Sequence, residues 1–398
     1  MPKVKKQDRI THLSRVVFEG YKSIDHLEID LVKGLNIIIG PNGSGKSNFL
    51  ELLDSLLKKG VLLPWMQQPL HNSSDIMMIT IGNRELRLNM ERKVKLNASS
   101  YINRLRLSLG RKLVYDSNRE KENKIARKKG VKVDLIAPSD LGYALHQINV
   151  SYPNIILIKY NLPDSLIAID KSGSIKIDKK NNVITTIDSS TDMLTSLFMN
   201  FIFNDNLWKP PLNNLVLDKE YILNKLKLPQ AVKNSLRKFS PIKDIRISPN
   251  LNIYEDENRA SIENIILDFF VEGQWVPWSW LSDGTKRLFY LISEISYFDN
   301  AIILIEEPEL GVHPDQFYSI MDFLKEQAED KQIIMSTHSP EALNILDENE
   351  LGNIIVTKYD KKKGTTMSHL GKKQMEKARA YMKELDLSDY WLSSDLEA

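Results

Sequence analysis

The chain has 398 residues, of which 42% are hydrophobic and 27% are charged, and its formal net charge is +2. This length suits one large domain or two medium ones with a substantial core. No stretch is long and apolar enough to predict a membrane span or a signal peptide, and the lack of cysteine excludes disulfides and thiolate metal sites. We therefore expect a cytoplasmic protein without a membrane partner.

The N-terminal part is predicted to begin with strands and to continue into a helix. Residues 14–39 indicate two or three short strands, and residues 46–59 have the broad apolar face of an amphipathic helix. Between them lies GPNGSGKSN, residues 40–48, which satisfies the pattern G-x-x-x-x-G-K-[ST] in the strand–loop–helix setting that it requires. This arrangement predicts a phosphate-binding loop.

The residues of this loop have separate expected roles in binding ATP and Mg²⁺. Its glycines let successive N–H groups point at phosphate oxygens, and the helix N-terminus adds partial positive charge. Lys46 is expected to bridge the β- and γ-phosphates, and the Ser47 hydroxyl to ligate Mg²⁺. The predicted nucleotide-binding residues are Gly40, Asn42, Gly43, Ser44, Gly45, Lys46, Ser47 and Asn48.

A basic stretch lies beyond the first strands. Residues 82–90 alternate as a strand does, and residues 92–132 carry fourteen Lys and Arg against three acids, or +11, which leaves −9 for the rest of the chain. The stretch is predicted to be helical in part. Such charge separation indicates a surface for a polyanion such as DNA, with a solvated helix or loop as the competing interpretation. Further on, residues 165–188 predict a β-meander, and residues 209–214 a linker.

Strand and helix patterns alternate again from about residue 243, and the first motif there is LSDGTKR, residues 281–287. Ser282 is a natural N-cap for the helix that begins there, and Gly284 permits close approach of the backbone. An ordinary helix cap explains the motif when it stands alone. Together with the phosphate-binding loop, it predicts a second phosphate contact, most economically supplied to the ATP of another subunit in a head-to-tail dimer.

Two further strand ends carry candidate catalytic groups. Residues 301–305 form an apolar strand pattern that ends in Glu306 and Glu307, and we assign Mg²⁺ binding to Glu306 and the role of general base to Glu307. The strand pattern at residues 332–336 is followed by Thr-His-Ser. This strand is expected to lie beside the strand of residues 301–305. A histidine after a strand is usually structural, but His338 would then lie near the γ-phosphate as a hydrogen-bonding sensor.

The ordered motifs GPNGSGKSN, LSDGTKRL, IEEPELGVHPD and STHSP resemble the ABC-type ATPase heads of the SMC, RecF and OLD (overcoming lysogenization defect) group, which are often described as AAA-family ATPases. The likeness is greatest to the compact OLD-like ATPases of bacterial anti-phage systems. It covers residues 10–60 and 245–350. It implies an α/β P-loop fold with a mixed sheet flanked by helices, an inserted α+β or helical segment, and dimerisation driven by ATP.

Several positions depart from the wider group. Asp283 and Thr285 stand where transporter signatures have Gly and Gln, which makes a transporter subunit improbable. Glu306 stands where many members have Asp, and His313 where transporters and SMC heads have a D-loop Asp. The Q-loop is unassigned; its candidates are Gln67, Gln68 and Gln147.

The resemblance and the motifs together predict four segments: an N-terminal lobe of the ATPase head (1–84), an inserted region (85–240), a C-terminal lobe (241–360) and an extension with an acidic tail (361–398). OLD nucleases carry a Toprim domain after the head. Sixty residues come after His338 here, which is too short for one, so a nuclease or toxin effector is expected on a separate polypeptide.

Three functions remain open from sequence. The first is a sensor or motor ATPase of an anti-phage or DNA-maintenance complex. The second is a scaffold, locked by ATP, that holds an effector silent; Tyr390 and Trp391 in the acidic tail could dock that effector, unless the tail is a frayed terminus. The third is a free-standing RecF-like repair ATPase, which DNA would stimulate without any partner protein. Residues 92–132 are the candidate DNA contact of the first function.

Overall fold

The computed structural model describes residues 11–57, 73–81, 84–94, 100–109, 111–116, 154–158, 173–181, 183–187, 219–220, 223, 229–297 and 301–393. The chain forms two compact units. The first consists of Met1–Tyr160, Phe298–Leu310 and Leu324–Ala398, and the second of Asn161–Tyr297 and Gly311–Phe323. None of the helices within the described ranges is long and apolar enough to cross a bilayer.

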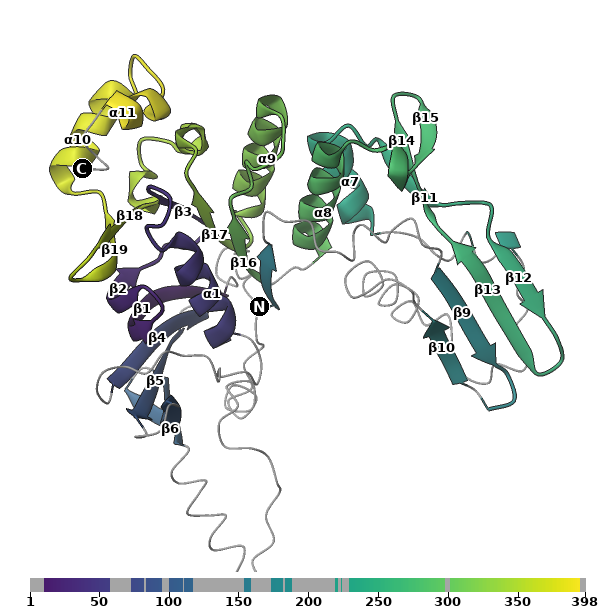
Figure 1. Cartoon of the computed structure of the whole chain (residues 1–398), viewed down its shortest axis with the longest axis horizontal. Coiled ribbons are helices and arrows are strands. Elements are labelled where there is room, and N and C mark those ends of the chain that lie inside the picture. Colours follow the sequence, from purple (N-terminus) through teal and green to yellow (C-terminus); the bar gives the residue numbers. More distant parts are fainter. Residues whose placement is uncertain are drawn as a thin grey trace, which may run out of the picture. The chain divides into compact units, whose positions relative to one another are not determined.

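The first unit is built on a mixed sheet in the order β7-β6-β5-β4-β1-β2-β19-β18-β3-β17-β16-β8 (Figure 1). Its parallel part has the order β18-β3-β17-β16-β8. The strands of this part are β3 (Leu35–Ile39), β8 (Asn154–Ile158), β16 (Ala301–Glu306), β17 (Gln332–Thr337) and β18 (Ile354–Asp360).

The parallel part forms the core of the first unit. Every residue of β3 and β17 is buried, as expected for parallel strands that are covered on both faces. The helix α1 (Lys46–Leu57) packs against β16, β8 and β17 through Phe49, Leu50 and Leu53, which are almost fully buried. The helix that carries Lys46 is therefore anchored on the strands that carry the other candidate groups.

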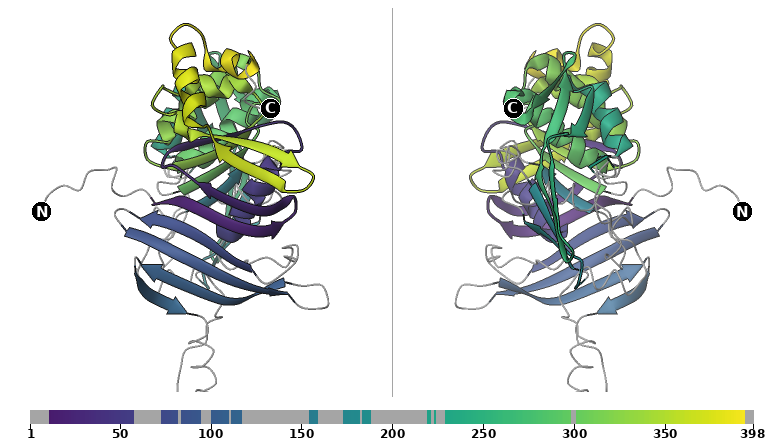
Figure 2. Two further views of the ribbon diagram at one scale, coloured as in Figure 1. Left: turned by 90° about the vertical axis from the view of Figure 1, so that its left-hand side faces the viewer. Right: turned by 90° about the vertical axis from the view of Figure 1, so that its right-hand side faces the viewer.

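The remaining strands of this sheet are antiparallel, and Figure 2 shows those from the N-terminal part of the chain in purple and blue. From Leu27 to Asp30 the burial alternates along β2, which is typical of a sheet with one exposed face. These strands are β1 (Thr11–Tyr21), β2 (Ile24–Asp30), β4 (Ser73–Ile81), β5 (Arg84–Val94), β6 (Ser100–Leu109), β7 (Lys112–Asp116) and β19 (Gly364–His369).

The second unit contains two antiparallel sheets, in the orders β10-β9-β13-β12 and β11-β14-β15. An aromatic cluster of Phe269, Trp278 and Phe289, with ring centroids 5.1–5.6 Å apart, packs the second sheet against helix α8. The elements are β9 (Gly173–Asp178), β10 (Val183–Ile187), α7 (Gln230–Phe239), β11 (Asp244–Ile247), β12 (Asn252–Glu255), β13 (Arg259–Ile265), β14 (Leu267–Val271), β15 (Gln274–Pro277), η3 (Trp278–Trp280) and α8 (Asp283–Tyr297).

The remaining helices lie late in the chain. Helix α9 (Pro314–Gln327) comes after β16 and contributes residues to both units. The 3₁₀ helices η4 (Pro340–Ile345) and η5 (Leu351–Asn353) come after β17, and α10 (Lys372–Tyr381) and α11 (Leu387–Ser393) after β19. Helix α11 packs against η4, and Tyr390 and Trp391 are only 9% and 3% exposed. The two aromatic rings are therefore part of the first unit and are not exposed for docking, whereas docking of an effector by the rest of the acidic tail stays a prediction.

Most of the predicted elements are confirmed. The strands in residues 14–39 are β1, β2 and β3, and the first predicted helix ends at Leu57. Of the predicted β-meander, β9 and β10 form a hairpin. The described part of the basic stretch consists of strands rather than helix, and residues 117–132 lie outside the described residues, as does the predicted linker at residues 209–214. The division into four segments stays a prediction.

Candidate functional site

Three neighbouring parallel strands bring the candidate groups of the first unit to one edge of its sheet. Ile39 of β3 is in register with Thr337 of β17, and Ser336 of β17 is in register with Glu306 of β16. Because parallel strands end at the same edge, the phosphate-binding loop, His338 and Glu307 come directly after the ends of adjacent strands. The sequence prediction that β17 lies beside β16 is confirmed.

The hairpin β18–β19 lies directly against the phosphate-binding loop, through Thr357 of β18 and Thr365 of β19. A Cβ atom on Gly40 would lie 2.2 Å from the carbonyl oxygen of Thr357, and one on Gly45, where φ is +99°, would lie 2.0 Å from Thr365 Oγ1. Two of the loop glycines are thus required by a close approach of the backbone as well as by the curvature of the loop. The strands β18 and β19 therefore restrict the position of the loop.

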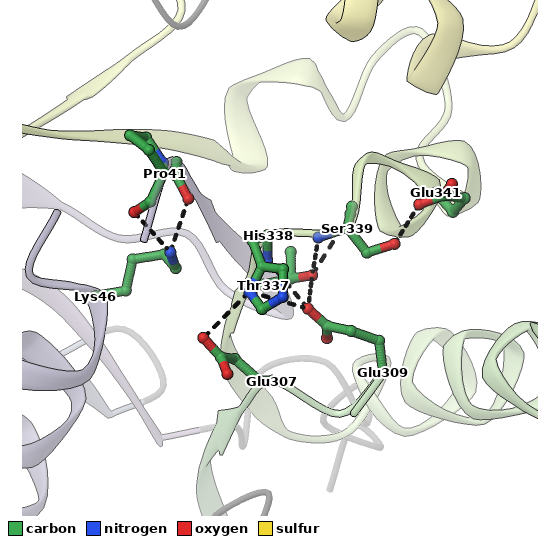
Figure 3. A network of polar contacts seen from close by, with 9 residues as sticks. Pro41, Lys46, Glu307, Glu309, Thr337, His338, Ser339 and Glu341 are labelled. Atoms are coloured by element: carbon green, nitrogen blue, oxygen red, sulfur yellow. Dashed lines mark hydrogen bonds and ion pairs between the residues drawn. The ribbon is translucent and has the colours of Figure 1, made fainter. Parts of the chain in front are cut away.

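Lys46 is the first residue of α1 and is almost fully buried. Its Nζ donates to the carbonyl oxygens of Gly40 (2.7 Å) and Pro41 (3.1 Å), so the ammonium group lies across the loop that it is predicted to serve (Figure 3). Hydrogen bonds to these two carbonyl dipoles help to offset the cost of burying the charge. A phosphate would replace these carbonyls as the stronger acceptor.

The other loop residues differ in exposure. Asn42 and Gly43 are exposed, and Ser47 is half-buried. Ser44 is only 2% exposed, and its Oγ has no hydrogen-bond partner among the described residues. Asn48 Nδ2 donates to Ser23 Oγ (2.7 Å), which links α1 to the turn between β1 and β2. Asn48 therefore has a structural contact beside its predicted role in nucleotide binding.

The turn after β16 presents the two predicted carboxylates in different ways. Glu306 ends the strand and is 8% exposed. Glu307 has φ +47°, a left-handed conformation that non-glycine residues rarely adopt and that is enriched at functional sites. Its N–H donates to the carbonyl oxygen of Ser336 (2.9 Å), and its carbonyl oxygen accepts from Leu310 N (3.2 Å). The surrounding turn thus holds the strained residue in place.

His338 contacts the predicted general base. Its Nδ1 lies 3.2 Å from Glu307 Oε1, and the two side chains point toward each other in Figure 3. An ionised carboxylate only accepts hydrogen bonds, so this contact requires the proton on Nδ1. The structure therefore brings together two of the residues to which the sequence assigned catalytic roles.

Glu309 is a site residue that sequence reasoning missed. Its Oε1 accepts hydrogen bonds from Thr337 Oγ1 (2.7 Å) and from the N–H of His338 (3.1 Å). Its side chain is 11% exposed. The available signal was a third acid two residues after Glu307, in the segment Glu-Glu-Pro-Glu.

Ser282 and Gly284 of the motif LSDGTKR lie in the second unit, at the N-terminus of α8. Ser282 Oγ accepts from Thr285 N (3.2 Å), so the predicted N-cap is confirmed. A Cβ at Gly284 would lie 2.4 Å from Gln316 Oε1 of α9, which is the end of a flexible side chain that can move aside, so this contact does not by itself require glycine. Ser282 and Asp283 are exposed, which leaves the capped end of α8 open to solvent within this unit.

Further along α8 a carboxyl group is strongly perturbed. Burial raises the pKa of Glu294 to about 7, and burial together with the nearby charge of Glu294 raises the pKa of Tyr290. The two residues are four positions apart and lie on one face of the helix. They were not among the predicted site residues, and nothing in the motif pattern pointed to them.

The first unit fits a nucleotide with Mg²⁺. The Ser44 hydroxyl, which has no partner among the described residues, and the buried ammonium group of Lys46 are donors suited to phosphate oxygens. The loop glycines Gly40 and Gly45 leave no room for a Cβ. Among the described residues no three His, Asp or Glu side chains cluster as a metal site. Such a cluster is not needed here, because Mg²⁺ is commonly held by phosphate oxygens, water and one or two protein oxygens, and Ser47 and Glu306 are the candidates.

Similarity to known proteins agrees with this geometry. Residues 35–92 and 95–344 match the family described as "AAA domain, putative AbiEii toxin, Type IV TA system". Endonuclease GajA from Bacillus cereus (strain VD045) is 25% identical over 369 residues, which are 85% of this chain and 57% of GajA. The DNA replication and repair protein RecF of Bifidobacterium adolescentis is 42% identical over 45 residues, 11% of each chain. The chain thus spans little more than half of the length of GajA.

A solved structure shows the same fold. The head of an Smc protein bound to the C-terminal winged-helix domain of ScpA superimposes with a TM-score of 0.50 at 14% identity, over 91% of this chain and 99% of that one. The P-loop, the mixed sheet with flanking helices and the match over more than three quarters of the sequence agree with one another. The chain therefore belongs to this AAA-domain family, and it has the fold of an ABC-type ATPase head of the SMC, RecF and OLD group.

Proposed function

We propose that the chain is a Mg²⁺-dependent ATPase that dimerises around ATP and works as the sensor or motor subunit of an anti-phage or DNA-maintenance complex, with a separate nuclease or toxin as effector. The observation that carries the proposal is the contact between His338 Nδ1 and Glu307 Oε1, at the sheet edge that also bears the phosphate-binding loop. A paired base and imidazole beside a phosphate cradle suit hydrolysis by water rather than transfer to a second substrate.

Each residue then has a defined role. Lys46 and the N–H groups from Asn42 to Ser47 would bind the β- and γ-phosphates, and Ser47 and Glu306 would hold Mg²⁺, which would neutralise charge on the phosphates. Glu307 orients the attacking water and accepts its proton, and His338 hydrogen-bonds the γ-phosphate. Ser282 and Gly284 contact the γ-phosphate of a second subunit's ATP, and the exposure of Ser282 supports this role.

The test is the variant Glu307→Gln, measured with and without MgATP. Gln cannot accept the proton, so kcat is expected to fall by about 10²–10³ while ATP binding persists. Light scattering coupled to gel filtration should then show a dimer with MgATP and a monomer without it. Lys46→Ala is the matched control, because it removes the phosphate contact and should prevent the dimer. If Glu307→Gln binds ATP and stays monomeric, the dimer mechanism is wrong.

The effector is the part of the proposal with the least support from the chain itself. GajA is named an endonuclease, and this chain covers 57% of that protein. We therefore test for an effector in the native setting, by purifying tagged Glu307→Gln with MgATP and identifying the proteins that elute with it. A nuclease or toxin retained by Glu307→Gln and lost in Lys46→Ala supports the role. Equal retention by both variants would show that the complex does not depend on ATP.

A second candidate function is direct binding of DNA, as in a RecF-like repair ATPase. The described residues of β5, β6 and β7, together with Arg111, carry eight Lys and Arg against three acids. Phosphate contacts from such residues release counterions, so affinity for duplex DNA should fall steeply between about 50 and 200 mM salt. Charge reversal of Arg87 and Arg111, both exposed, should reduce the salt slope. Binding that is independent of salt would contradict this function.

A further inference from the structure

The turn after β16 contains a second carboxylate that contacts the loop of His338. Glu309 Oε1 accepts from Thr337 Oγ1 at 2.7 Å and from the N–H of His338 at 3.1 Å, and it lies 3.8 Å from His338 Nδ1 (Figure 3). A single oxygen atom thus binds both the last side chain of β17 and the backbone of the histidine. This contact joins the end of β16 to the end of β17.

The other carboxylate oxygen distinguishes Glu309 from a general base. Its Oε2 is buried and has no hydrogen-bond partner among the described residues. A buried oxygen without a partner costs free energy, which the two hydrogen bonds to Oε1 must offset. Neither oxygen is suited to deprotonate a water: one is already occupied by two donors, and the other is closed to solvent.

Glu307 differs from Glu309 in its exposure and in the group that it contacts. Its side chain is more exposed, at 18% against 11%, and its carboxylate contacts the imidazole itself, through His338 Nδ1. The two carboxylates therefore have different surroundings, although they are two residues apart in one turn. We propose that Glu309 is a positioning residue, which fixes the hydroxyl of Thr337 and the backbone of His338 so that the imidazole stays in contact with Glu307.

The proposal rests on the proposed ATPase function and adds a mechanical link to it. Ser339 N donates to Thr337 Oγ1 (2.9 Å), so the hydroxyl that binds Glu309 also closes the turn beyond His338. Glu307 N in turn donates to Ser336 O (2.9 Å). The two strand ends are thus tied at three successive residues, Ser336, Thr337 and His338. A displacement of one strand end should move the base and the imidazole together.

The first test compares variants on both sides of the contact. Glu309→Leu, which has no acceptor, and Thr337→Val are each expected to lower kcat about tenfold and to leave KM for ATP within about twofold, because the ground-state phosphate contacts of Lys46 are untouched. Thr337→Ser keeps the hydroxyl and should retain near wild-type kcat. Thermal unfolding of all three variants identifies any that do not fold. A fall in ATP affinity equal to the fall in kcat/KM would overturn the positioning role.

A double-mutant cycle separates action through His338 from a general structural effect. If Glu309 acts by placing the imidazole, Glu309→Leu should lower kcat by less than about twofold once His338 is already replaced by Ala. A purely structural role predicts that the full tenfold loss is added to the loss in His338→Ala. The second result would reject the proposal even if both single variants are slow.

A measurement without turnover keeps the proposal testable if the wild-type chain hydrolyses no ATP, which would refute the proposed function alone. In protein labelled with ¹⁵N-histidine, the His338 ring resonance is identified by its absence in His338→Ala. We expect this resonance to shift or broaden in Glu309→Leu and in Thr337→Val, and to stay unchanged in Thr337→Ser. An unchanged His338 resonance in Glu309→Leu would overturn the proposal, whether or not the chain is active.

Discussion

The candidate residues of the first unit and those of the second unit are held in place by different means. Gly40, Glu307 and His338 come directly after the ends of adjacent, fully or nearly buried parallel strands, and the hairpin β18–β19 closes behind the loop. Ser282, by contrast, caps an exposed helix terminus through local hydrogen bonds with the N–H and the hydroxyl of Thr285. The first set is fixed by the core of the sheet, and the second by a local contact.

This difference predicts two kinds of consequence for mutation. Changes in the first set alter phosphate binding, the base or the fold of the loop within one chain. A change at Ser282 leaves that machinery intact, and it should impair activity only if the serine serves another chain's nucleotide. Four expected outcomes test how each of the two units is held together and used, from the largest effect to the smallest.

The largest effect is expected from mixing two inactive variants. Lys46→Ala lacks the phosphate contact, and Ser282→Arg replaces the serine that is proposed to contact a second subunit's ATP by a bulky side chain. Each variant alone should therefore lose at least about 10²-fold in ATPase rate. In a head-to-tail dimer, a mixed pair retains one intact site. A mixture in equal amounts should therefore recover an ATPase rate well above that of either variant alone, because each mixed dimer has one working site. A site completed within one chain predicts no recovery.

The loop glycines should show the next largest effect. Gly45→Ala would place a Cβ 2.0 Å from Thr365 Oγ1 at φ +99°, whereas Gly43, at φ +76°, has nothing within 4 Å. Gly45→Ala should therefore cost about 3 kcal/mol of stability, and Gly43→Ala only about 1 kcal/mol, which is the cost of the left-handed backbone. Thermal and urea unfolding measure both. Equal losses would mean that β19 does not hold the loop.

Much of this arrangement could be predicted from the sequence, because the apolar runs at residues 35–39, 301–305 and 332–336 each end in a functional motif. Each motif therefore has a predictable place at the end of its strand. The positive φ of Glu307 could not be predicted, since it depends on the turn that binds Ser336 O and Leu310 N. Nor could the support of the loop by β18–β19, because Thr357 and Thr365 are more than 300 residues away in the chain.

The contact made by Glu309 was missed for a related reason. An acid two residues after the base has no assigned role in the motif pattern, and its partner Thr337 is 28 residues away. Only the parallel register of β16 and β17 brings the two together. Ser282 is the opposite case: its cap depends on Thr285, three residues on, and was therefore predicted from local sequence.

The third prediction concerns the pH dependence of the second unit. Burial raises the pKa of Glu294 in α8 from its ordinary 4.5 to about 7, so the folded state disfavours the ionised form. The contribution of Glu294 to the free energy of unfolding is fully present below pH 4.5 and is lost as the pH rises to about 7, because Glu294 ionises at a lower pH in the unfolded chain than in the folded one. Glu294→Gln should match wild type at pH 5 and exceed its stability by about 2 kcal/mol at pH 8.

Glu257→Gln is the matched control for this pH dependence, since Glu257 is an exposed acid of the same unit. Its stability should equal that of wild type at both pH values. Unfolding by urea at pH 5 and pH 8 provides the measurement. A stability difference between Glu294→Gln and wild type that is the same at both pH values would show that Glu294 is not held neutral by burial.

The smallest effect should come from the cap of α8, and it separates the two roles of Ser282. Ser282→Ala removes the hydrogen bond to Thr285 N and should cost about 1 kcal/mol of stability, whereas Ser282→Thr keeps a capping hydroxyl and should cost less. If Ser282 also contacts the ATP of a second subunit, the ATPase rate of Ser282→Ala should fall by far more than the lost cap explains, while its thermal unfolding shifts by only a few degrees. A rate that simply tracks the small change in stability would make the serine a helix cap and nothing more.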